Sequence, residues 1–243
     1  IVLSHESAAC LHRLSIARPW PHAVHITEPE DTGRRSGRGV VVHRAVLEPD
    51  EIVEIDGVLV TSLARTLIDL ALSSTTIDAL VAIDAARDRR SPRIGLDELL
   101  EALARRSPRG ARRADRILAF SSELAMSPNE TCGRYAVHLL GFPEPVEQLE
   151  VRVAGGRCRY LDLGWPKHSA GLEIDGYSKY VEDSAATIWA EKEREAELAD
   201  VGIRSTRIRW SDYHALARVA TRVRSIGIPR QPRPIPRSLF DLP

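Results

Sequence analysis

The chain has 243 residues, of which 43% are hydrophobic and 28% charged, a composition that excludes a disordered protein. Its 34 basic and 34 acidic residues cancel, so the net charge does not by itself indicate a nucleic-acid partner. No apolar run reaches the ~18 residues of a membrane helix and no signal peptide is recognisable, so we predict a cytoplasmic protein without a membrane partner. The three scattered cysteines lack a C-x-x-C pair, which favours reduced thiols.

The first half of the sequence predicts an α+β domain over residues 1–108. A helix is expected after Ser4, strands are expected in "HAVHIT" and "RGVVVHRA", and "EIVEIDGVLV" is typical of a hairpin that turns at its Asp-Gly pair. The run "TSLARTLIDLAL" then predicts a helix with Ser62 or Thr61 as its N-cap. Further helices are expected over residues 76–89, 96–105 and 111–122.

A basic stretch joins this half to the next, and we treat residues 109–126 as a linker and helix. The run "RRSPRGARRADR" carries six arginines against one aspartate. Such a run is either a solvated linker and helix start or a patch that contacts DNA phosphates. In the second case, the expected contacts are Arg109, Arg112 and Arg113.

Residues 127–226 predict an α/β domain with a central mixed sheet flanked by helices. A helix is expected from Ser127, followed by strands in "EQLEVRV", "CRYLDLGW" and "AGLEID". A helix over residues 184–200, a strand in "IRSTRIRW" and a helix in "SDYHALARVATRVRS" complete the order. The proline-rich tail, residues 227–243, is expected to be extended, as a linker or as a ligand for a partner.

The tetrapeptide EIDG occurs twice, at residues 54–57 and 173–176. The first copy is explained by the hairpin turn. In the second copy, strand alternation places Glu173 and Asp175 on one face, and a hairpin with the preceding run brings Asp162 beside Glu173. Such carboxylates are costly to bury unless cations neutralise them, and they are typical ligands for Mg²⁺ at a site that hydrolyses phosphodiesters. The alternative interpretation is a solvated strand end followed by a turn.

The motifs "SPNE", "YLDLGWP", "GLEIDGYSKY" and "WAEKEREAELADVGIRSTRIRWSDY" carry a resemblance. Over residues 125–215 the chain resembles the restriction-endonuclease-like PD-(D/E)xK superfamily, and within it an actinobacterial branch related to very-short-patch-repair endonucleases. The resemblance implies an endonuclease that cleaves DNA with Mg²⁺ or Mn²⁺. It implies that Asp162 and Glu173 hold the metal, that Asp175 assists, and that Glu130 is the acidic residue of the first core helix. Helix capping explains Glu130 equally well.

The sequence departs from the superfamily at position 175, where a lysine is usual and Asp175 stands instead. Lys179, four residues on, is our candidate for the lysine's catalytic role, and Lys192 is a second candidate. Lys192 and Arg194 are also candidate DNA contacts, as are the arginines of residues 204–209, although a solvated helix explains the first two as well. Gln148 corresponds to a polar residue near the active site of related enzymes.

The first half is similar to the middle region of AbiEi-type antitoxin-like proteins, on the strength of "LSHESAACLHRL", "RRSGRGVVVHRA" and "DGVLVTSLARTLIDLA". Proteins of that type often carry a winged helix ahead of this region, and the start at Ile1 rather than Met indicates an incomplete N-terminus. This similarity implies an alternative function. The chain would then be a non-catalytic DNA-binding regulator that retains a degenerate nuclease fold, with a cognate toxin as a partner.

Overall fold

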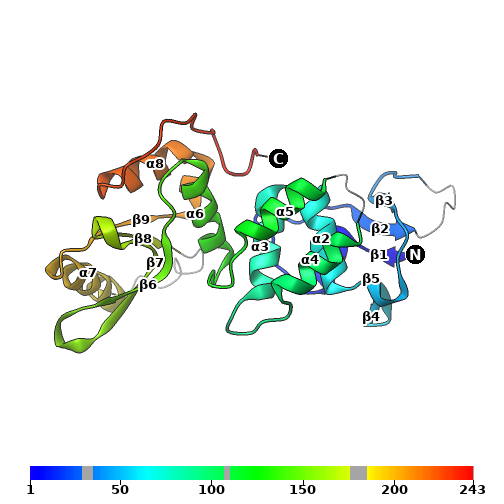
Figure 1. The fold of residues 1–243 in the computed structure, drawn as a ribbon, viewed down its shortest axis with the longest axis horizontal. Coiled ribbons are helices and arrows are strands. Elements are labelled where there is room, and N and C mark those ends of the chain that lie inside the picture. The colour runs from blue at the N-terminus through cyan, green and yellow to red at the C-terminus, as the bar shows by residue number, and fades with distance from the viewer. Residues whose placement is uncertain (29–34, 107–109, 176–184, 243) are drawn as a thin grey trace. The chain divides into compact units, whose positions relative to one another are not determined.

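The structure is a computed structural model that describes residues 1–28, 35–106, 110–175 and 185–242 (Figure 1). The chain divides into two compact units, residues 1–128 and 129–242, and each unit is built on one mixed β-sheet with its own helices. The predicted combination of helices with β-sheets is therefore confirmed. Cys10, Cys132 and Cys158 are free thiols. Within the described ranges, no helix combines the length and the apolar character that crossing a membrane requires.

The sheet of the first unit has five strands in the order β3-β2-β1-β5-β4. Their bounds are β1 (Val2–Leu3), β2 (Val24–Glu28), β3 (Val40–Arg44), β4 (Ile52–Ile55) and β5 (Val58–Thr61). The strands β4 and β5 form the predicted antiparallel hairpin, and the two turn residues have positive φ, 50° at Asp56 and 79° at Gly57. Asp-Gly suits this turn because glycine adopts positive φ without a steric penalty. The strand β1 was not predicted, because two residues are too few to show the alternation of a β-strand.

In the described part of the first unit, five α-helices lie at the positions predicted from the sequence. They are α1 (His5–Leu11), α2 (Leu63–Ser73), α3 (Thr76–Arg87), α4 (Leu96–Ala104) and α5 (Ala111–Phe120). Ser62, rather than Thr61, is the N-cap of α2, because its side chain accepts a hydrogen bond from the Arg65 amide at 3.3 Å. Leu67, Ile68 and Leu70 of α2 are fully buried, so this helix is the centre of the core.

The sheet of the second unit has four strands in the order β6-β7-β8-β9. They are β6 (Val146–Arg152), β7 (Cys158–Trp165), β8 (Ala170–Ile174) and β9 (Arg204–Ile208), with β9 parallel to β8 and the other pairs antiparallel. A Cβ atom on Gly171 would collide with the side chain of Leu161 on the neighbouring strand. Glycine is therefore required where β7 packs closely against β8.

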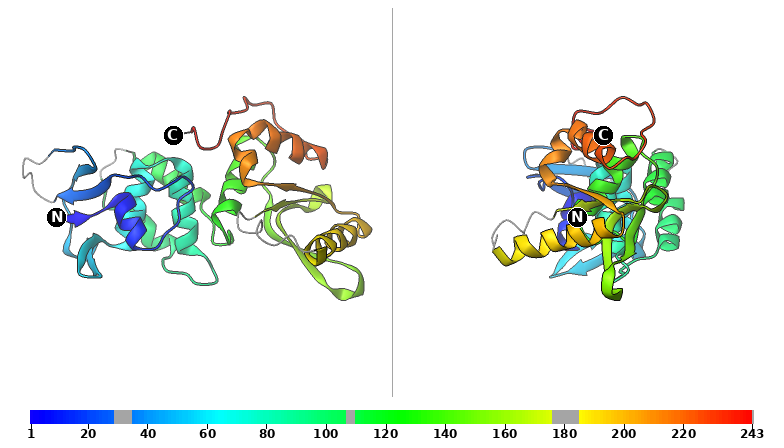
Figure 2. Two further views of the ribbon diagram at one scale, coloured as in Figure 1. Left: turned by 180° about the vertical axis from the view of Figure 1, so that it is seen from behind. Right: turned by 90° about the vertical axis from the view of Figure 1, so that its left-hand side faces the viewer.

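Helices α6 (Pro128–Leu139), α7 (Ala185–Asp200) and α8 (Leu216–Ser225) flank this sheet, so the predicted order of helix, three strands, helix, strand and helix is confirmed. The last helix begins at Leu216 rather than at residue 211, because residues 210–214 form a separate 3-10 turn. Figure 2 shows α6 and α8 on one face of the sheet and α7 on the other. Ile174 points toward Gly133 of α6, whereas the adjacent Glu173 pairs with Arg194 of α7, as strand alternation requires.

The proline-rich tail packs on the second unit. The Gln231 amide donates to the Gly141 carbonyl at 2.9 Å, and the Leu239 amide donates to the Tyr213 carbonyl at 2.9 Å. Leu239 is fully buried, and the ring centroid of Phe240 lies 5.1 Å from that of Trp210. The tail therefore contributes Leu239 to the core of this unit, whereas residues 231–235 are exposed.

Candidate active site

A row of polar residues crosses the sheet of the second unit. Glu173 on β8 lies opposite Arg207 in the register with β9. Asp162 on β7 lies next to the last paired position of β7 and β8, which places it beside Glu173. The Asp162 Oδ2 atom accepts a hydrogen bond from the Ile174 amide at 2.6 Å, at the point where the β7–β8 ladder stops. The structure thus brings Asp162 and Glu173 together on two central strands.

Gln148 continues this row on β6, between two residues that pair with the neighbours of Asp162. Its φ of 50° lies in the left-handed region, which is unusual for a residue other than glycine and costs about 1–3 kcal/mol. The Gln148 Nε2 atom donates to Glu130 Oε2 at 2.9 Å, so it links β6 to the acidic residue of α6. Backbone strain of this kind concentrates at functional sites.

The ionisation of Asp162 is strongly affected by its surroundings. The pKa of Asp162 is raised to about 6, mainly by burial and also by the nearby charges of Glu130 and Glu173, while the hydrogen bond from the Ile174 amide acts in the opposite sense. Arg194 also lowers this pKa, but it forms its ion pair with Glu173. Negative charge around Asp162 is therefore only partly compensated, which is a property of catalytic and metal-binding carboxylates.

Glu173, only 8% exposed, is held by two arginines. Its Oε1 atom lies 2.8 Å from Arg194 Nε, and its Oε2 atom lies 2.8 Å from Arg207 Nη2. Arg207 also contacts Glu191 Oε1 at 2.9 Å and Asp175 Oδ1 at 3.2 Å. Burial alone would lower the pKa of Arg207, but the hydrogen bond to Glu173 and the surrounding carboxylates raise it. The cations that neutralise the buried Glu173 carboxylate are thus Arg194 of α7 and Arg207 of β9.

Asp175 occupies the end of β8 and is fixed through both its backbone and its side chain. Its amide donates to the Ile208 carbonyl at 3.0 Å, and its carbonyl accepts a hydrogen bond from the Asn129 side chain. The fully buried Tyr213 hydroxyl donates in turn to the Asn129 carbonyl at 2.9 Å, which ties the start of α6 to this strand end. The Asp175 carboxylate lies between Arg207 and Arg209 and points to the same face as Glu173, as predicted.

Of the predicted lysines and DNA contacts, Lys179 and Arg109 lie outside the described residues. Lys192 is exposed on α7, and its Nζ atom lies 6.0 Å from the ring centroid of Trp189, which is itself 73% exposed. Arg194 is not a solvated helix residue, because it reaches Glu173 and also donates to the Tyr160 carbonyl at 2.5 Å. The structure therefore places Arg194 within the candidate site.

The basic stretch before the second unit is partly used by the fold. Arg113 donates to the carbonyls of Ala71, at 2.6 Å, and Ser74, and these contacts satisfy the C-terminal end of α2. Arg105 forms an ion pair with Asp50 at 2.7 Å. Arg112 is exposed on α5. Structural contacts therefore explain Arg113, and Arg112 is the better candidate for a phosphate contact.

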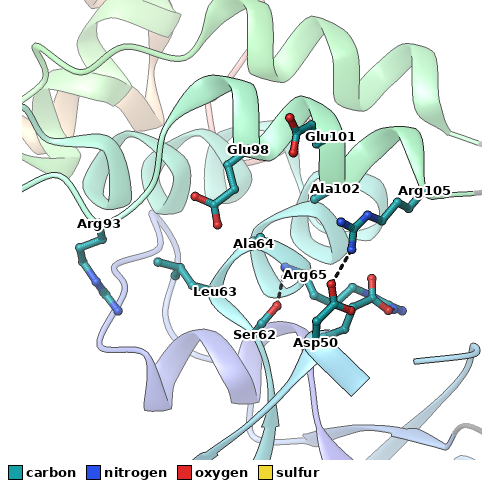
Figure 3. Close-up of a pocket in the computed structure, with 11 residues that line it drawn as sticks. Asp50, Ser62, Leu63, Ala64, Arg65, Arg93, Glu98, Glu101, Ala102 and Arg105 are labelled. Atoms are coloured by element: carbon teal, nitrogen blue, oxygen red, sulfur yellow. Dashed lines mark hydrogen bonds and ion pairs between the residues drawn. The ribbon is translucent and has the colours of Figure 1, made fainter. Parts of the chain in front are cut away.

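A pocket in the first unit lies at the N-terminal end of α2 (Figure 3). Arginines and acids line it together, and they pair with one another, as Arg105 does with Asp50 and as Arg65 does with Glu51 at 2.8 Å. Arg93 and Glu98 add one charge of each sign to its wall. The wall carries four acids against three arginines, and several of these charges are paired with one another, so we place the candidate site in the second unit.

Three histidines of the first unit form a cluster that the sequence did not reveal. The rings of His5 and His43 stack with centroids 3.4 Å apart, and His25 Nδ1 lies 3.1 Å from His43 Nε2 and 3.0 Å from Glu6 Oε2. Burial, with the neighbouring imidazoles, lowers the pKa of His5 to about 2 and that of His43 to about 4.

The described side chains do not form a ready-made metal cluster. Among them, no group of three or more His, Cys, Asp or Glu residues could hold a metal ion. Mg²⁺, however, commonly keeps several water ligands and takes only one or two carboxylates together with substrate phosphates. The adjacent Asp162 and Glu173 fit that mode of binding in donor type and in charge, provided that Glu173 releases one of its arginines.

Protein-family models, curated proteins and solved structures were each compared with the chain, and none of them matches it. The function is therefore inferred from the geometry of the site together with the resemblance carried by its motifs.

Proposed function

We propose that the second unit is a metal-dependent DNA endonuclease with a restriction-endonuclease-like fold. The observation that carries the proposal is the position of Asp162 beside Glu173, with Glu130 near enough to contribute to a pKa of about 6 for Asp162. The order α6-β6-β7-β8-α7-β9-α8 supports the fold assignment, since the resemblance implies a mixed sheet flanked by helices. The strained backbone of Gln148, which holds Glu130, supports the position of the site.

In this proposal, Asp162 and Glu173 hold Mg²⁺ or Mn²⁺, and Glu130 adds a third negative charge that favours a cation at this place. When bound, the ion would lower the pKa of a water molecule and neutralise charge that develops on the scissile phosphate. The chain itself fixes the ligands: the Ile174 amide orients Asp162, and Gln148 orients Glu130. Exposed arginines such as Arg112 contribute contacts to the DNA backbone.

A second candidate function is favoured by the arginines on Glu173. Both oxygens of this carboxylate are ion-paired, and a metal ion would have to displace Arg194 or Arg207. Together with the AbiEi-like first half, this arrangement supports a non-catalytic DNA-binding regulator, with a cognate toxin as a partner. Such a protein binds DNA in metal-free buffer and does not cleave it when metal is added.

Nicking of supercoiled plasmid in Mg²⁺ or Mn²⁺ tests the proposal. We expect the wild type to nick the plasmid and Asp162→Asn to reduce the rate by at least about 10²-fold, because it removes one metal ligand. Glu54→Gln, in the exposed copy of EIDG, is the matched control and should retain full activity. A wild type that does not nick, or an Asp162→Asn variant as active as the wild type, would show the proposal to be wrong. Gel-shift binding without nicking would instead support the regulator.

A further inference from the structure

The charge around Asp175 is unusual for an aspartate. Its Oδ1 atom lies 3.2 Å from Arg207 Nε, and its Oδ2 atom lies 3.7 Å from Arg209 Nε. Arg207 is shared with the carboxylates of Glu173 and Glu191, whereas the ion pair of Arg209 among the described residues is to Asp175. Arg209 therefore brings a positive charge close to the position at which the resemblance implies a lysine.

The two arginines differ in how much of their hydrogen-bonding capacity the protein uses. The Arg207 side chain is 23% exposed and contacts the carboxylates of Glu173, Asp175 and Glu191. The Arg209 side chain is 57% exposed, and among the described residues its ion pair is to Asp175, at a long 3.7 Å. A guanidinium group has five N–H donors, so this contact uses only part of the hydrogen-bonding capacity of Arg209.

The backbone holds Arg209 in this position. Ile174 pairs with Ile208 in the parallel ladder, so Arg209 directly follows the end of β9, next to the end of β8. The Arg209 amide donates to Asp212 Oδ2 at 3.1 Å, and Asp212 is in turn paired with Arg222 at 3.1 Å. The backbone therefore fixes the point from which the Arg209 side chain extends, and a guanidinium group can bind a phosphate through two parallel hydrogen bonds.

We propose that Arg209 contacts a backbone phosphate of DNA at the candidate site, in place of the lysine that is absent from position 175. The ligand class is a phosphodiester, and Arg207 is the internal partner of the carboxylates rather than a DNA contact. This inference rests on the proposed function insofar as that function requires DNA at these carboxylates. To that function it adds the identity of a residue, Arg209, that binds the DNA phosphate.

The salt dependence of DNA binding tests the inference without any cleavage. Fluorescence anisotropy with a duplex oligonucleotide in metal-free buffer, at several NaCl concentrations, gives the slope of log K against log salt. Each phosphate contact contributes about 0.9 to that slope, so Arg209→Gln should reduce its magnitude by about one. Arg209→Lys keeps the charge and should retain the slope. Arg152→Gln, at an 85% exposed arginine of the edge strand β6, is the control and should also leave it unchanged.

A second readout separates this inference from the proposed function. If the wild type nicks plasmid, Arg209→Gln should lower the turnover rate by about 10²-fold, as expected when one group that stabilises a developing charge is removed. An unchanged salt slope in Arg209→Gln would overturn the inference even where Asp162→Asn abolishes nicking. If the wild type does not nick plasmid but Arg209→Gln has a smaller salt slope of DNA binding, the endonuclease proposal is overturned and the phosphate contact is supported. Thermal denaturation checks that each variant is folded.

Discussion

The two copies of EIDG have the same four letters and opposite surroundings. In the first copy, Glu54 and Asp56 are exposed, and Gly57 completes a tight turn at the edge of a sheet. In the second, Glu173 is buried on a central strand and held by Arg194 and Arg207. The difference comes from sheet order: β4 is an edge strand, whereas β8 has neighbours on both sides. The strands that flank a motif, rather than its letters, therefore decide whether its acids are exposed or buried and paired.

The largest difference between the copies is expected in stability. Glu173→Ala leaves two arginines without their buried partner and should cost about 3–5 kcal/mol in the free energy of unfolding. Glu54→Ala removes an exposed side chain and should change that free energy by no more than about 0.5 kcal/mol. Urea denaturation followed by tryptophan fluorescence measures both. Equal costs would mean that the arginine pairs contribute little, and the contrast between the copies would then fail.

The next prediction concerns pH and Asp162. Its pKa is raised in the folded state to about 6, so its protonation favours folding at low pH, and that contribution is lost as pH rises from about 4 through 6. A shift of this size corresponds to about 3 kcal/mol. Asp162→Asn should therefore be more stable than the wild type at pH 8. Urea unfolding at a series of pH values measures this, and identical pH profiles for the two proteins would contradict it.

Local patterns were sufficient to predict most of the fold and part of the site. The hairpin at Asp56-Gly57 and the position of Asp162 beside Glu173 both follow from short-range strand pairing, which the sequence displays directly. The start of α8 was predicted too early because the segment before Leu216 is also compatible with a helix, and only the fold shows that it forms a 3-10 turn.

The features of the site that the sequence did not predict depend on contacts between residues far apart in the chain. Arg207 reaches Glu173 across a parallel pair joined by a crossover, and such a register cannot be derived from local periodicity. The positive φ of Gln148 also depends on tertiary packing. His5, His25 and His43 meet because α1 lies against two parallel strands, so their separation in sequence conceals the cluster.

The histidine cluster should give the first unit a pH response of opposite sign to that of Asp162. The pKa of His43 is lowered to about 4, so the unfolded chain binds its proton more readily, and stability falls as pH drops from about 6.5 toward 4. Allowing for solvent screening of a partly exposed ring, we expect a loss of about 2 kcal/mol. His43→Gln should reduce this loss, whereas His22→Gln, at an exposed histidine, should not. Urea unfolding between pH 4 and 7 distinguishes them, and an unchanged acid response in His43→Gln would contradict the prediction.

The smallest expected effects lie in the turn of the first copy, where glycine matters and the acid does not. Gly57→Ala places a Cβ at φ 79° and should cost about 1 kcal/mol. Asp56→Asn keeps a residue that tolerates the left-handed region and should change stability by less than about 0.5 kcal/mol, because Asn-Gly suits the same turn. Chemical denaturation of both variants measures the contrast. If Asp56→Asn were the more damaging of the two, the Asp56 carboxylate would have a role beyond the turn, and the two copies of EIDG would be more alike than their surroundings indicate.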